Sequence, residues 1–294
     1  MTSKDKQKVA LVLSGGASRG IAHIGVIEEL EKRGYEITSI AGTSMGSLIG
    51  GVYATGKLAE LKDFMYSLDK GKVFRLVDFT LNKQGLIKGD KVLKKMKDYV
   101  PDMLIEDLPV PYAAVATDLV NKEEVVFRSG SLYHAIRASI SIPSVFTPVM
   151  EGNRLLVDGG LLNNLPLSCV ERREGDMAVA VHVNADIPHL KPETTEESAK
   201  KQALYQKKMK EFYSHIHPSS SSAEGRLGYF SLITESFELM TMRMAEEKIK
   251  QFSPEVLINV SRNSCNLYDF YKAEEQVEAG RRAAIEVLDN IKKG

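Results

Sequence analysis

The sequence predicts a three-layer α/β/α fold with a mostly parallel central sheet, and three observations support this. Short apolar runs alternate with stretches whose apolar residues recur at helical spacing. The order strand, helix, strand, helix is complete within the first 56 residues, which is typical of a parallel sheet covered by helices. The 294 residues are 43% hydrophobic and 27% charged, a balance that allows a substantial core. We therefore expect one α/β domain over residues 1–294.

The expected strands are short apolar runs. The first covers residues 9–13 and ends at Ser14-Gly15-Gly16, and the second covers residues 37–41. Later runs predict further strands at residues 112–117, 124–127, 155–157, 177–183 and 256–260.

The expected helices lie between these strands. In the first, at residues 20–32, Ile21, Ile24, Ile27 and Leu30 recur at helical spacing, and Gly34 marks its end. The others are expected at residues 48–54, 58–68, 91–99, 132–138 and 272–292.

One region departs from this alternation. From about residue 186 to 227 the composition becomes polar, with a charged helical stretch at residues 196–213. An apolar stripe at helical spacing follows, formed by Phe230, Ile233, Phe237, Met240 and Met244. We expect residues 186–250 to be an insertion in the α/β domain. The stripe either packs on the core or forms a lid or lipid-contacting surface, since Met and Phe adapt to irregular apolar ligands.

Composition excludes several classes of protein. Basic and acidic residues both number 39, and this zero net charge argues against nucleic acid binding, which needs a basic face. Cys169 and Cys265 have no metal-ligand spacing and are too few for a disulfide framework, which suits a reduced, cytoplasmic protein. No stretch resembles a signal peptide or approaches the ~18 apolar residues of a bilayer-spanning helix. Any membrane contact is therefore expected to be peripheral, at the inner membrane surface.

The run Gly42-Thr43-Ser44-Met45-Gly46 carries the strongest functional signal. It follows an expected strand and opens an expected helix, which is the arrangement of a nucleophile elbow. The flanking Gly42 and Gly46 allow the tight turn, and the helix N-terminus favours negative charge beside the serine. Ser44 is therefore the candidate nucleophile.

A second glycine-rich loop, Ser14-Gly15-Gly16-Ala17-Ser18-Arg19-Gly20, joins the first expected strand to the first expected helix. Its backbone N–H groups can converge on one point. A dinucleotide-binding G-x-G-x-x-G fingerprint would need glycine at Ala17, and no Walker lysine follows. We favour an oxyanion hole, formed by Gly15, Gly16 and Ala17, over a phosphate-binding loop.

The general base is harder to assign. A triad of the α/β-hydrolase type would require a histidine after a final strand, and none of the later histidines (His134, His182, His189, His215, His217) occupies such a place. Asp158 offers another base, because it ends the strand at residues 155–157 and precedes Gly159-Gly160. An ordinary turn aspartate also fits this position. Asp118 fits a supporting role or a turn, and His23 fits a structural role.

Together these motifs resemble the patatin-like phospholipase family. The matching residues follow the family's order over residues 9–165: the loop from Gly15 to Gly20, the elbow from Gly42 to Gly46, Asp158-Gly159-Gly160, and the block Ala138-Ser139-Ile140-Ser141-Ile142-Pro143 with Phe146 and Pro148. The family often has glycine where this chain has Ala17, but an alanine N–H donates equally well.

The resemblance implies a patatin-like fold and a Ser-Asp dyad without histidine. Ser44 would be the nucleophile and Asp158 the general base, with an oxyanion hole at Gly15, Gly16 and Ala17. Supporting roles would fall to Arg19, Gly20, Gly42, Gly46, Gly159 and Gly160. Arg19 would either steady the loop or meet a phosphate head group.

The expected activity is hydrolysis of carboxylic esters in phospholipids, lysophospholipids or related lipids through an acyl-enzyme, with no metal or other cofactor. The expected partner is a lipid or another acyl ester, and the oligomeric state does not follow from the sequence. Two alternatives stay open: an α/β-hydrolase-type esterase with a Ser-Asp-His triad, and a catalytically silent regulatory or scaffold protein.

Overall fold

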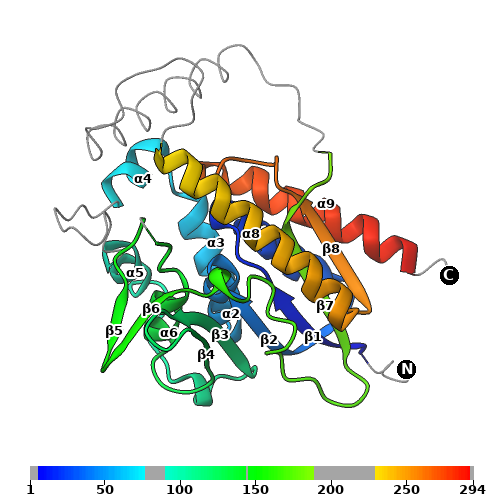
Figure 1. The fold of residues 1–294 in the computed structure, drawn as a ribbon. Helices are drawn as coiled ribbons and strands as arrows, with labels where there is room; N and C mark the ends of the chain where they lie inside the picture. Colours follow the sequence, from blue (N-terminus) through cyan, green and yellow to red (C-terminus); the bar gives the residue numbers. More distant parts are fainter. Residues whose placement is uncertain (1–5, 77–89, 144, 189–228, 292–294) are drawn as a thin grey trace, which may run out of the picture.

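The computed structural model describes residues 6–76, 90–143, 145–188 and 229–291 (Figure 1). Within these ranges one mixed sheet is flanked by helices. Its strands are β1 (Lys8–Leu13), β2 (Glu36–Thr43), β3 (Tyr112–Asp118), β4 (Glu123–Phe127), β5 (Val149–Glu151), β6 (Arg154–Asp158), β7 (Met177–Ala185) and β8 (Val256–Ser261). The strand order is β5-β6-β3-β2-β1-β7-β8, with β4 also paired to β3.

The helices between the strands follow the same chain order. They are α1 (Ala22–Lys32), α2 (Met45–Ala54), α3 (Leu58–Tyr66), α4 (Lys70–Leu76), α5 (Asp90–Met96), α6 (Leu132–Ser139), α8 (Tyr229–Phe252) and α9 (Ala273–Ile291). Short 3₁₀ turns are η1 (Ala17–Ile21), η2 (Ile105–Asp107), η3 (Gly159–Leu161) and η4 (Phe270–Lys272). Among the described helices, none combines the length and apolar character needed to cross a membrane.

The sheet is parallel at its centre and antiparallel at one edge. β1 pairs in parallel with β2 and β7, β2 with β3, and β7 with β8. The pairs β3–β4, β3–β6 and β5–β6 are antiparallel. Because the carboxyl ends of parallel strands meet at one edge of a sheet, the loops after β1 and β2 lie side by side.

The two faces of the sheet are covered by different helices. Along β1, Val9, Leu11 and Leu13 pack with α1, α2 and α9 on one face. Val12 points to the other face, where it packs with Ala245 of α8 and with the segment after η3. Figure 1 shows α8 crossing this second face, with α9 on the opposite side of the sheet.

These elements confirm the predicted α/β fold class, with a central sheet between helices. Each predicted strand is present within two residues of its expected bounds. Helix α4 and strand β5 were not predicted, and β5 has only three residues, too few to display an alternating pattern. The first predicted helix begins instead as the 3₁₀ turn η1. The helix expected at residues 196–213 lies outside the described residues, as does most of the expected insertion.

Three apolar residues of the stripe predicted on α8 lie at a cavity and not among the residues that the helix buries. The residues that α8 buries include Thr241, Met242 and Ala245. Of the predicted stripe, Ile233, Phe237 and Met240 instead line a cavity, described below. The helix predicted from the spacing of the stripe is present as α8. The distribution of apolar residues does not by itself show which face of α8 meets the core.

Helices α1 and α9 touch backbone to backbone at two glycines. A Cβ atom on Gly25 would overlap the carbonyl oxygen of Val277, and one on Gly280 would overlap that of Ala22. These contacts place α9 directly against α1, which carries the glycine-rich loop at its N-terminal side. The close approach therefore depends on the missing side chains at both positions.

We expect Gly280→Ala to destabilise the protein by about 1–3 kcal/mol, because the added methyl group forces the two helices apart. This corresponds to a fall in Tm of several degrees. The exposed substitution Glu286→Ala on the same helix serves as the control and should leave Tm nearly unchanged. Helix propensity alone would make Gly280→Ala more stable than wild type. A higher Tm for Gly280→Ala in calorimetry would therefore contradict the close packing of α1 against α9.

Candidate active site

Ser44 occupies a strained turn between β2 and α2. Its φ and ψ are 54° and −123°, and such a backbone conformation costs a non-glycine residue on the order of 1–3 kcal/mol. The turn around Ser44 is tightly packed. A Cβ on Gly42 would overlap the carbonyl of Gly46, and one on Gly46 would overlap that of Leu13. Strand, turn and helix thus have the geometry of the predicted nucleophile elbow, with Ser44 at its tip.

The backbone of Ser44 is held by Ser139, at the end of α6. Ser44 N–H donates to Ser139 Oγ at 2.9 Å, and Ser139 Oγ–H donates to the carbonyl of Val115 at 2.6 Å. Both bonds are buried, so they are strong relative to exposed ones. Ser139 belongs to the fourth block of the family resemblance, but the sequence analysis gave it no role.

The strand register brings Asp158 next to Ser44. On β3, Val115 pairs with Thr43 of β2, and the next residue, Ala116, pairs with Asp158 of β6. Ser44 and Asp158 therefore leave the sheet at adjoining positions, although 114 residues separate them (158 − 44). A Cβ on Gly159 would overlap the carbonyl of Val115, so the glycine after Asp158 permits this approach.

The two oxygens of Asp158 have different surroundings. Oδ1 accepts a hydrogen bond from the N–H of Gly160 at 2.7 Å. Oδ2 is buried and meets no hydrogen-bond partner among the described residues, although the Ser44 hydroxyl lies near enough to lower the pKa of the carboxyl. Burial outweighs both contacts and raises the pKa of Asp158 to about 6.

The glycine-rich loop has two free backbone donors. Gly15 N–H is already engaged, because it donates to the carbonyl of Asn164 at 3.0 Å. The N–H groups of Gly16 and Ala17 have no acceptor in the described part of the chain, and both residues line the same cavity as Ser44. The structure thus leaves two of the three predicted oxyanion donors available and assigns Gly15 to supporting the loop.

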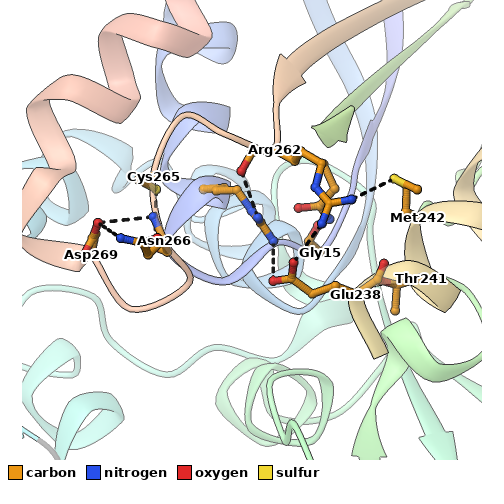
Figure 2. Close-up of polar contacts among 11 residues, drawn as sticks. Gly15, Glu238, Thr241, Met242, Arg262, Cys265, Asn266 and Asp269 are labelled. Carbon is orange, nitrogen blue, oxygen red and sulfur yellow. Dashed lines mark hydrogen bonds and ion pairs between the residues drawn. The ribbon is translucent and has the colours of Figure 1, made fainter. Parts of the chain in front are cut away.

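Arg19 follows these donors and turns away from solvent. Its guanidinium donates to the carbonyl of Arg262 and forms an ion pair with Glu238 of α8, both at 3.0 Å. Glu238 also pairs with Arg262 at 3.5 Å, and Figure 2 shows the two side chains facing each other. Arg19 therefore joins the loop to α8, and Gly20 packs against Met45 of the elbow helix.

A cavity of about 430 Å³ opens over these groups. Its wall contains Ser44, Asp158, Gly16 and Ala17. Much of the remaining wall is apolar and includes Ile142, Pro143, Val145, Leu161, Phe237 and Met240. Such a pocket, mainly apolar with polar groups in its wall, is suited to a small apolar ligand.

Comparisons with known proteins agree with this geometry. Residues 11–169 match the family described as patatin-like phospholipase. The chain belongs to this family. An uncharacterised NTE family protein of Mycobacterium tuberculosis is 31% identical to it, over 96% of this chain and 91% of the relative. A Kluyveromyces lactis protein named lysophospholipase NTE1 is 27% identical, over 98% of this chain and 20% of the relative.

The fold has a counterpart among solved structures. The crystal structure of VipD from Legionella pneumophila matches with a TM-score of 0.51 at 16% identity, covering 98% of this chain and 67% of VipD. Membership of the patatin-like phospholipase family identifies the protein as a hydrolase of lipid esters.

The histidines that the structure describes do not reach into this cavity. His23 is buried below the loop, with Nε2 2.8 Å from the carbonyl oxygen of Ser14, and burial lowers its pKa to about 4. His182 is buried on β7, where desolvation also lowers its pKa to about 4. His134 pairs with Glu151 at the antiparallel edge. None of these three lines the cavity, and His189, His215 and His217 lie outside the described residues.

Asp118 closes a turn, the simpler of its two expected roles. Its Oδ1 accepts from the N–H of Val120 at 2.9 Å and of Leu155 at 3.3 Å, and Asn121 donates to Oδ2. These backbone bonds lower the pKa of the carboxyl, and the residue does not line the cavity.

The raised pKa of Asp158 predicts that the stability of the fold depends on pH. The folded protein binds the Asp158 proton more tightly than the unfolded chain, so this group stabilises the fold at low pH and loses that effect as pH rises through about 6. Asn cannot ionise. Asp158→Asn should therefore exceed wild type in stability at pH 8, by about 3 kcal/mol at most for a shift of ~2 units, and the gap should shrink toward pH 4.

Thermal unfolding of both proteins between pH 4.5 and 8 measures this gap. Asp63→Asn, at an exposed position on α3, is the matched control and should show no such pH dependence. An Asp158→Asn protein that is less stable than wild type at pH 8 contradicts a buried, desolvated carboxylate.

Proposed function

We propose that this protein is a serine acyl hydrolase in which Ser44 is the nucleophile and Asp158 is its general base, without a histidine. The observation that carries the proposal is the buried Oδ2 of Asp158, which has no hydrogen-bond partner in the described part of the chain and shares one cavity with Ser44. A buried carboxylate oxygen without a partner is costly, and such costs are concentrated at functional sites.

In the acylation step, Ser44 Oγ attacks the carbonyl carbon of the ester while Asp158 Oδ2 takes the hydroxyl proton. The carbonyl oxygen gains negative charge, and the N–H groups of Gly16 and Ala17 donate to it. The ester C–O bond then breaks, and the leaving alcohol takes the proton from Asp158. The product of this step is an acyl ester of Ser44.

Deacylation repeats the sequence with water. Asp158 accepts a proton from the water as its oxygen attacks the acyl carbonyl, and the same two N–H groups stabilise the second oxyanion. When the bond to Ser44 Oγ breaks, the proton returns from Asp158 to that oxygen and the fatty acid leaves. Each cycle restores both residues.

The surroundings of Asp158 make a carboxylate suitable for this work. A general base is most effective when its pKa lies near the working pH, and an ordinary aspartate is too weak a base near neutrality. Burial raises the pKa of Asp158 to about 6 and keeps Oδ2 free of competing donors. Gly159 and Gly160 hold this carboxyl, as Gly42 and Gly46 hold Ser44.

The substrate class we propose is an ester of a phospholipid, a lysophospholipid or a related lipid. The family carries the name phospholipase, and one relative is named a lysophospholipase. The apolar side chains that line the cavity together with Ser44 suit an acyl chain.

Peripheral contact with a membrane also belongs to this proposal. On α8, Leu232 and Met240 line the cavity and are 53% and 54% exposed. Leu239 is similarly exposed on the same helix. Apolar side chains at the mouth of a lipid site can enter the boundary region of a bilayer, and α8 would then form the lid or lipid-contacting surface, one of the two alternatives that the sequence leaves open for its apolar stripe.

Intact mass after treatment with a lipid-like fluorophosphonate tests the dyad. Wild type should gain one adduct, Ser44→Ala none, and Asp158→Asn should react about 10²–10⁴-fold more slowly, the range for loss of a general base. Ser236→Ala removes another cavity serine and should label like wild type. Detergent is added in parallel to open the site. Full labelling of Ser44→Ala, or no labelling of wild type with detergent present, contradicts the proposal.

The pH dependence of hydrolysis tests the base separately. Only ionised Asp158 can accept a proton, so kcat/KM on a soluble short-chain ester should fall tenfold per pH unit below about pH 6. The buried His23 and His182 titrate near pH 4 and do not produce this limb. His134→Gln is the control and should keep it. A profile that stays flat from pH 5 to 8 while chemistry limits the rate rules out Asp158 as the base.

A further inference from the structure

Asn184 lies beside the oxyanion loop although no sequence motif includes it. It is on β7, next to the strand that leads into the loop, and only 8% of it is exposed. Its Nδ2 donates to the carbonyl oxygen of Gly15 at 2.8 Å, and the bond is buried. Asn184 also lines the cavity that contains Ser44.

This hydrogen bond fixes the direction of a neighbouring donor. The peptide that joins Gly15 to Gly16 is trans, as are the other described peptide bonds. In a trans peptide the carbonyl oxygen and the following N–H point in opposite directions. With the Gly15 carbonyl held against β7 by Asn184, the Gly16 N–H must point away from β7.

The peptide needs such a restraint because glycine stands on both sides of it. Glycine accepts most backbone conformations, so a peptide between two glycines can rotate with little steric resistance. Rotation by half a turn would replace the Gly16 N–H with the Gly15 carbonyl oxygen. A carbonyl oxygen there would repel the oxyanion that the N–H is meant to stabilise.

The remaining bonds of the loop do not fix this peptide. Ser14 N–H donates to the carbonyl of Val181, and Val183 N–H donates to Ser14 Oγ. Gly15 N–H donates to the carbonyl of Asn164. On the other side of the peptide, Arg19 N–H donates to the carbonyl of Gly16 at 3.1 Å and Ser18 N–H donates to the carbonyl of Leu267 at 3.2 Å. None of these bonds involves the Gly15 carbonyl, for which Asn184 is the donor found among the described residues.

We propose that Asn184 is a positioning residue, whose amide holds the Gly15–Gly16 peptide in the one orientation that presents Gly16 N–H to the reacting carbonyl. The inference rests on the proposed acyl hydrolase function and deepens it. A neutral donor is required at this position. An aspartate would repel the Gly15 carbonyl, and a leucine of similar size would leave it free to turn.

The test uses Asn184→Leu and Asn184→Asp in the full chain, with a soluble short-chain ester. The oxyanion exists only in the transition state, so kcat and kcat/KM should both fall about 10–100-fold while KM stays within about threefold. The inhibition constant of a trifluoromethyl ketone, which forms an oxyanion on the serine, should rise by the factor by which kcat/KM falls.

The matched control is Gln276→Leu, which removes another buried amide, one whose hydrogen bonds go to Ser264 and not to the Gly15–Gly16 peptide. It should lower Tm as Asn184→Leu does but leave kcat and the inhibition constant unchanged. If Asn184→Leu does not fold, Asn184→Asp, with almost the same shape, provides the same comparison.

Each outcome has a defined meaning. Active wild type with unchanged kcat in a folded Asn184 variant overturns the positioning role alone. A change in KM only, or a loss of activity matched by Gln276→Leu, assigns Asn184 a purely structural role and also overturns it. A wild type that hydrolyses no ester overturns the proposed function, and this inference with it.

Discussion

The site depends on the way strand β3 changes partners. Its residues up to Val115 pair with β2, and from Ala116 onward the pairing passes to β6. This exchange places the ends of β2 and β6 at adjoining positions, so that Ser44 and Asp158 meet. The antiparallel β6 is what brings an aspartate from a distant part of the chain to the carboxyl end of a parallel strand.

Two features at this junction cost folding free energy, and both belong to the proposed catalytic residues. Ser44 is held at a positive φ, and one oxygen of the buried Asp158 meets no hydrogen-bond partner in the ranges that the structure describes. Neither arrangement favours folding by itself. The apolar packing of α1, α2 and α9 on one face of the sheet offsets these costs, and hydrogen bonds with Ser139 and Gly160 keep the two residues in place.

Much of the fold and the centre of the site followed from local sequence. Apolar runs predicted the strands, and glycine spacing predicted the elbow and the loop, because each depends on residues close together in the chain. Asn184, Asn164 and Glu238 were not foreseen, since their importance arises from contacts between residues far apart in sequence. The role of Gly15 was also beyond local pattern, because only the fold shows that its N–H is taken by Asn164.

The ion pair between Arg19 and Glu238 links the glycine-rich loop to α8. The first residue belongs to the turn after the oxyanion donors, and the second to the helix that lines the cavity. Because this pair is nearly buried, movement of α8 would expose the Arg19 charge and release a contact of the loop. The position of α8 and the geometry of the oxyanion loop are therefore physically connected.

The central claim is that an aspartate, with no histidine, activates Ser44. The most direct measurement is kcat/KM for six variants, each with one of the six histidines changed to glutamine, compared with Asp158→Asn in the same assay. The account predicts that every histidine variant stays within about tenfold of wild type while Asp158→Asn loses several orders of magnitude. A folded histidine variant that loses as much activity as Asp158→Asn would contradict it.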